Sequence, residues 1–170
     1  MARILPEPWM RGPLDGVSPL IAPVLYSFQQ ANEDLVKYTA NMRPAQVWAR
    51  PHGLAPLGFH LRHIAGSVSR LTMYLQNLPL TPQQFEALHA EMTPGAGVEE
   101  LLNAMVQSFD QATAIITGID QAELCGTRGV GRERLPTTVI GLLVHIAEHT
   151  QRHVGQAISA AKLVQFFPVA

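Results

Sequence analysis

The sequence contains a single cysteine, Cys125, among its 170 residues. A disulfide framework within the chain is therefore excluded. A chain of this length buries about two-thirds of its unfolded surface on folding, so it needs neither disulfides nor a metal ion to fold. It has the size of one ordinary domain, and we expect a single domain over residues 1–170.

Runs of charge of one sign are also absent. Lys and Arg number 12, Asp and Glu number 13, and the formal net charge is −1. Proteins that bind DNA or RNA normally carry a basic patch or stripe. Because this chain has none, we expect no nucleic-acid partner.

The third absence is a long apolar run. No segment approaches the roughly 18 uninterrupted apolar residues that span a bilayer, and Pro6, Glu7 and Pro8 interrupt any signal-peptide core. We therefore expect a cytoplasmic protein that does not enter a membrane. Hydrophobic residues nevertheless make up 47% of the chain and charged residues 15%. Apolar helix faces must then pack against each other or against a second copy of the chain.

Apolar residues recur at steps of three and four, which is typical of amphipathic helices. The long predicted helices cover residues 18–42, 57–77, 98–117 and 136–164. A short helix over 82–92 would begin after Thr81 as N-cap. The proline- and glycine-rich residues 1–17 predict an extended N-terminal arm anchored by Trp9, and residues 120–136 predict a long loop that could hold a small hairpin. This order of elements predicts an all-α protein, a four-helix bundle with a long loop before the last helix.

The last predicted helix carries His145, His149 and His153, each four residues after the one before. Residues four apart share a helix face, and transition metals bind imidazole nitrogens. The direction drifts by about 40° every four residues, so two neighbouring histidines bind one ion more easily than all three. We take His149 and His153 as that pair. The remaining donor is expected in residues 58–71, which carry His60 and His63.

Several alternatives stay open at this point. The histidines could be hydrogen-bonded polar groups of the core, and His60 or His145 could orient ligand imidazoles from outside. Glu148 projects about 100° away from His149 on a helix, so it is not a candidate catalytic base. Arg62 and Arg152 could hold a carboxylate of a substrate or lie solvated on the outer face.

Two stretches resemble the DinB/YfiT-like superfamily of metalloproteins. They are LGFHLRHIAGS at 57–67 and LLVHIAEHTQRHVGQ at 142–156, the second ending in two histidines four apart followed by Gly-Gln. The resemblance covers residues 18–165 and implies an up-down-down-up four-helix bundle. It implies a metal held by His63, His149 and His153, with further positions open to water or substrate. It also implies a homodimer, and some relatives are S-transferases that use low-molecular-weight thiols such as bacillithiol or mycothiol.

Three neutral imidazoles leave a bound metal its full charge, which favours Lewis-acid chemistry on a thiol or a water molecule. The expected cofactor is a divalent transition metal, with zinc or nickel favoured and manganese, iron or cobalt compatible. Our leading hypothesis is a metal-dependent thiol transferase or hydrolase that acts on a small molecule. No catalytic residue beyond the metal is identified. The alternative is a non-catalytic metal-binding or stress-response dimeric bundle protein, whose site is structural or vestigial.

Overall fold

The computed structural model describes residues 5–166, which contain six α-helices and one two-stranded sheet. Residues 1–4 of the expected N-terminal arm lie outside the described part. The elements in order are α1 (Ala22–Thr39), α2 (Pro44–Val47), α3 (Leu57–Leu75), α4 (Pro82–His89), α5 (Val98–Ile116), β1 (Thr127–Val130), β2 (Leu135–Thr138) and α6 (Val139–Phe166).

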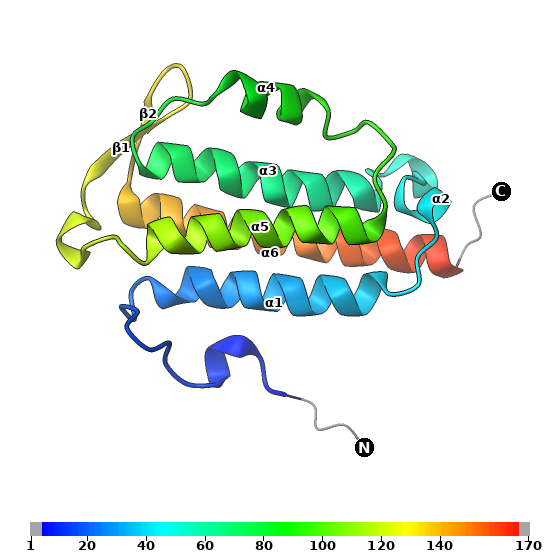
Figure 1. The fold of residues 1–170 in the computed structure, drawn as a ribbon, viewed down its shortest axis with the longest axis horizontal. Coiled ribbons are helices and arrows are strands. Elements are labelled where there is room, and N and C mark those ends of the chain that lie inside the picture. Colours follow the sequence, from blue (N-terminus) through cyan, green and yellow to red (C-terminus); the bar gives the residue numbers. More distant parts are fainter. Residues whose placement is uncertain (1–4, 167–170) are drawn as a thin grey trace.

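The four long helices lie side by side around one core (Figure 1). α6 packs against α1 and α3, and α5 packs against α3 and α1. α1 and α6 run in one direction, whereas α3 and α5 run in the opposite one (Figure 1). The chain therefore brings α3 and α6 together although they are far apart in sequence.

The expected apolar stripe of α3 is buried. Its members Leu61, Ile64 and Val68 are fully inaccessible to solvent, and Leu71 and Leu75 are nearly so. Elsewhere the core is closed by aromatic packing, since Phe28 of α1 stacks on Phe109 of α5 with ring centroids 4.4 Å apart. Among the described residues, no helix combines the length and the apolarity that a bilayer crossing requires.

The helix boundaries differ from the predicted ones at several ends. α1 begins at Ala22 rather than at residue 18, so Pro23 and not Pro19 occupies its first turn. There the missing N–H of proline costs little, because the first amides of a helix lack intrahelical partners. The short helix α4 ends at His89, and Thr81 caps it as predicted, because its hydroxyl accepts a hydrogen bond from the amide of Gln84 at 3.2 Å.

The last long helix begins later than predicted, and the segment before it forms the small hairpin that the sequence allowed. Residues 127–138 form an antiparallel hairpin in which Gly129 lies opposite Pro136. Both strands of a two-stranded sheet are edge strands. A proline, which has no N–H to donate, is tolerated on such a strand. α6 therefore begins at Val139, whose amide donates to the carbonyl of Gly126 at 3.0 Å.

The two tryptophans differ in burial, and Trp9, which was expected to anchor the N-terminal arm, is the more exposed. Trp9 lies in the described part of the arm but is 62% exposed. Trp48 follows α2 and is half-buried, and its Nε1–H donates to the carbonyl of Ala96 at 2.8 Å. Its ring lies against Gly58 so closely that a Cβ added there would be 2.7 Å from ring carbons. Glycine at position 58 is therefore needed for this contact.

We expect Gly58→Ala to lower the free energy of unfolding by about 1–3 kcal/mol, because the rigid ring of Trp48 must move away from its hydrogen bond. Urea unfolding of the wild type, of Gly58→Ala, of Trp48→Ala and of the double variant measures the contact between the two residues. The loss from Gly58→Ala should be much smaller in the Trp48→Ala background. An equal loss in both backgrounds would contradict the assignment.

Candidate metal centre

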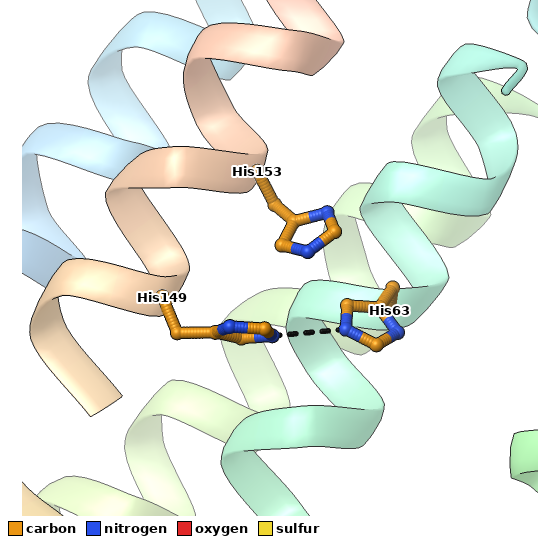
Figure 2. A group of neighbouring side chains, drawn as sticks. All are labelled: His63, His149 and His153. Carbon is orange, nitrogen blue, oxygen red and sulfur yellow. Dashed lines mark hydrogen bonds between the residues drawn. The ribbon is translucent and has the colours of Figure 1, made fainter. Parts of the chain in front are cut away.

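The two histidines selected on α6 point toward α3. His149 and His153 lie one turn apart, with ring centroids 4.7 Å apart, and both project into the space between the two helices (Figure 2). His145, one turn earlier, lies farther around the helix, and its side chain is 46% exposed. The rotation of an α-helix thus separates the third histidine from the pair.

His63 of α3 meets this pair from the opposite side (Figure 2). Its Nε2 lies 2.9 Å from the Nε2 of His149, and its ring centroid lies 4.3 Å from that of His153. One nitrogen from each of the three residues falls within 4.8 Å of the others, so the group could hold a metal ion. The structure therefore brings together the three residues that the sequence singled out.

The spacing of these nitrogens suits a shared cation. Two imidazole nitrogens bound to one ion at about 2.0–2.1 Å lie about 2.9–3.4 Å apart, depending on the angle between them. Without an ion, His63 and His149 can share only one proton between their Nε2 atoms, and the Nδ1 of His149 is buried without a hydrogen-bond partner. Metal binding would satisfy the facing lone pairs at Nε2, and it would require the proton of His149 to reside on Nδ1.

A carboxylate orients His63 by contacting its Nδ1, the ring nitrogen that does not face His149. Glu91, in the turn after α4, is buried, and its Oε2 lies 2.7 Å from the Nδ1 of His63. Since an ionised carboxylate only accepts, Nδ1 carries the proton and Nε2 keeps its lone pair for a metal. Such carboxylate–histidine contacts fix the tautomer and raise the basicity of a ligand imidazole.

Glu91 is itself held by a buried arginine. The Nη2 of Arg70 forms an ion pair with Oε1 of Glu91 at 2.9 Å, and both side chains are nearly inaccessible to solvent. Gly66 lies beneath this pair, because a Cβ at that position would be 2.6 Å from Nη1 of Arg70 and 2.9 Å from Oε1 of Glu91. Glycine at position 66 therefore leaves the space that this ion pair occupies beside α3.

His153 has a corresponding outer partner in His60. The Nδ1 atoms of the two rings lie 3.1 Å apart, and His60 is buried. When the Nδ1–H of His153 donates to His60, the Nε2 of His153 is free to face the other two imidazoles. His60 is thus a neighbour of the triad rather than a member of it, which answers one of the alternatives left open by the sequence.

Burial favours the neutral form of His60, His149 and His153. Burial, reinforced by the neighbouring His63, lowers the pKa of His60 to about 4. Burial and four neighbouring cationic groups, with His63 the largest, lower the pKa of His153 to about 4, and burial likewise lowers the pKa of His149. Burial opposes ionisation of Glu91, but His63 and Arg70 outweigh it and lower the pKa of that carboxyl. Neutral imidazoles beside an ionised carboxylate are the states that bind a metal.

Beside the triad lies a cavity of about 430 Å³ between the start of α3 and the middle of α6. Its walls include Phe59 and His60 on one side and Arg152 and Gln156 on the other. The ring of Phe59 also packs on His63, with centroids 5.3 Å apart. This cavity is therefore adjacent to the histidines and large enough for a small organic molecule.

The remaining candidates have other partners. Glu148 accepts hydrogen bonds from His145, at 2.7 Å, and from Arg152, and His145, Glu148 and His149 form a second group that could hold a metal. Arg62 is half-buried, and its Nη1 donates to backbone carbonyls of the turn after α4. Cys125 is exposed.

Sequence reasoning missed Glu91, Arg70 and Gly66. A usable signal existed in α3, where Arg70 interrupts a buried apolar stripe and therefore requires a carboxylate partner. Gly66, one turn before Arg70, leaves room for that partner. Nothing near Glu91 in the sequence identifies it as the carboxylate.

Comparison with known proteins gives one family. Residues 27–157, well over half of the chain, match the family model described as DinB superfamily. This range includes the three converging histidines as well as His60, Arg70 and Glu91. A search of curated proteins found no match.

The metal-free protein should lose stability as the pH falls from about 7 to 5. The folded pKa values of His60 and His153 lie near 4, below the ordinary 6.5, so the unfolded chain binds more protons in this interval and unfolding is favoured. Well above pH 6.5 both states are neutral and this contribution is flat. Allowing for solvent screening, we expect a loss of about 1–3 kcal/mol, measured by urea unfolding in the presence of a chelator.

Carboxylates do not obscure this test, because the pKa of Glu91 lies below its usual value and its titration falls at lower pH. A His60→Asn/His153→Asn variant should show a shallower decline between pH 7 and 5. A decline as steep as in the wild type would contradict the assignment of the buried imidazoles as its source.

Proposed function

The chain belongs to the DinB superfamily, and on that premise we propose that it is a divalent-metal-dependent protein whose ion is held by His63, His149 and His153. The observation that carries the proposal is the convergence of three imidazole nitrogens from α3 and α6 within 4.8 Å. We take the four long helices as the up-down-down-up four-helix bundle of this superfamily, in a single domain that forms a homodimer. Leu20 and Val144, which are exposed beside the groove between α1 and α6, support an interface there.

The activity that we propose is transfer of a low-molecular-weight thiol of the bacillithiol or mycothiol type to a small electrophile, with hydrolysis of an ester or amide as the related possibility. When bound, a divalent ion would supply Lewis acidity that lowers the pKa of a thiol or of water. Zinc or nickel is the proposed ion, because imidazole donors suit both.

The chain's own residues would prepare this site in two ways. Glu91 and His60 orient His63 and His153, so that the ligand nitrogens need no rearrangement at the moment of binding. The cavity beside Phe59 and His60 would receive the substrate. Arg152 lies at this cavity, where it would favour a substrate with a negative charge.

A second candidate function is a structural metal site that ties α3 to α6. The observation in its favour is the second group formed by His145 and Glu148 with His149, which places a fourth donor near the triad. A structural site is closed by four protein ligands, whereas a catalytic one keeps an exchangeable position.

We expect purified, tag-free protein to contain close to one equivalent of a transition metal, measured by elemental mass spectrometry. A His149→Ala/His153→Ala variant should lose it and remain folded by circular dichroism. The matched control is His52→Ala/His89→Ala, which also removes two histidines, neither of them in a group of the described residues that could hold a metal, and should keep the metal. Loss of metal in both variants, or retention in both, would contradict the triad.

The same proteins separate the two candidate functions. Each metal form is assayed for S-alkylation of a small thiol by a chloroacetamide, in which the sulfur–carbon bond forms and chloride and the thiol proton leave. A rate above the uncatalysed one that is lost in His149→Ala/His153→Ala supports transfer. Stoichiometric metal with no rate enhancement, for this reaction or for ester hydrolysis, favours the structural site.

A further inference from the structure

Glu91 depends on a segment with little regular structure of its own. It lies between α4 and α5, in residues 90–97, where Thr93, Pro94 and Gly95 are all exposed. Gly95 has a φ of 143°, a conformation that favours glycine. The conformational preferences of this turn alone therefore do not keep the Glu91 carboxylate in contact with His63 of α3.

Arg62 fastens this turn on both sides of Glu91. It directly precedes His63 in α3, and its Nη1 donates to the carbonyl oxygens of Ala90, at 2.9 Å, and of Thr93. These carbonyls belong to the residue before Glu91 and to the second residue after it. A guanidinium has several donors in a fixed plane, so it can hold two carbonyls at a defined separation.

Trp48 holds both Arg62 and the far end of the turn. The guanidinium carbon of Arg62 lies 4.7 Å from the centre of the indole ring, a distance at which a cation and an aromatic face attract. The indole N–H donates to the carbonyl of Ala96 at 2.8 Å. Residues 90–96 are thus fixed to α3 and to Trp48 at three carbonyls.

We propose that Arg62 is a positioning residue of the metal centre, which acts through Glu91. Together with Trp48 it fixes residues 90–96 so that the Glu91 carboxylate stays on Nδ1 of His63, and this raises the affinity for a divalent transition ion. Arg62 need not touch the ion. The inference rests on the proposed function, because it requires that the triad binds a metal.

The alternative is that Arg62 merely stabilises the fold, and the two roles differ in their coupling to Glu91. If Arg62 acts through Glu91, its removal should weaken metal binding only while the carboxylate is present. If it acts on stability alone, its removal should have the same effect on metal binding whether or not Glu91 is changed. A double-mutant cycle on affinity, with unfolding measured in parallel, distinguishes the two.

The experiment measures Zn²⁺ affinity of the full chain by competition with a chromophoric chelator, for wild type, Arg62→Ala, Glu91→Gln and the double variant. We expect Arg62→Ala to weaken binding by about three- to thirtyfold, within the range of losses seen for outer partners of metal ligands. In the Glu91→Gln background the further loss should be within about twofold. Arg62→Lys should recover part of the affinity, because one ammonium cannot reproduce the planar set of donors.

The matched control is Arg128→Ala, which also removes an arginine that donates to a backbone carbonyl, but at Leu75, the opposite end of α3. It should change the affinity by less than about threefold. Equal losses from Arg62→Ala in both backgrounds, or no loss in the wild type, would overturn the proposal.

Two further variants are used if the first ones fold poorly. If Arg62→Ala is unstable, Trp48→Phe takes its place, because it removes the hydrogen bond to Ala96 but keeps an aromatic ring. If Glu91→Gln is unstable, Glu91→Asp takes its place, because its shorter side chain keeps the negative charge facing Arg70. In that cycle too, the second substitution should add little to the loss of Zn²⁺ affinity caused by the first, and additive losses would overturn the proposal. If wild type and His149→Ala/His153→Ala bind Zn²⁺ equally, the proposed function itself has failed, and this inference fails with it.

Discussion

The contact between α3 and α6 is the constraint on which the rest of this structure depends. It brings His63 within 2.9 Å of His149, a residue 86 positions away in the sequence. The apolar stripe of α3 fixes which face of that helix turns inward, and the imidazoles then follow from helical geometry alone. Because closely packed helices of a folded core have little freedom to shift, the nitrogens meet with a defined spacing.

Charge around this contact is arranged in layers. Imidazoles occupy the centre, and the Glu91 carboxylate lies outside His63, paired with the buried Arg70. A buried ion pair is costly unless its remaining polar atoms are satisfied. Oε2 of Glu91 accepts from His63, whereas Nη1 of Arg70 has no hydrogen-bond partner among the described residues. The arrangement is stable only when α4, the following turn and α3 are all in place. The stability of the fold and the proposed metal affinity would therefore depend on the same few side chains.

Helices and the histidine faces could be predicted from the sequence because they follow from local periodicity. The stripe from Leu61 to Leu75 is buried as expected, and His63, His149 and His153 do come together; their role as ligands stays a prediction. The hairpin at 127–138 was expected only as a feature that the loop could contain, because its strands are short and proline obscures one of them. Glu91 could not be found, since its position depends on contacts that Arg62 and Trp48 make across a turn without a pattern of its own.

The sequence separation of the converging histidines also has a kinetic consequence. The chain between His63 and His149 must close a loop of about half the protein before their rings can meet, and the entropy of that closure opposes early formation of the contact. Contacts of such long range form late in folding when local helices form first. An interaction that is absent from the folding transition state slows unfolding rather than accelerating folding. An ion shared by these two helices would therefore prolong the lifetime of the native state more than it would shorten the time needed to reach it.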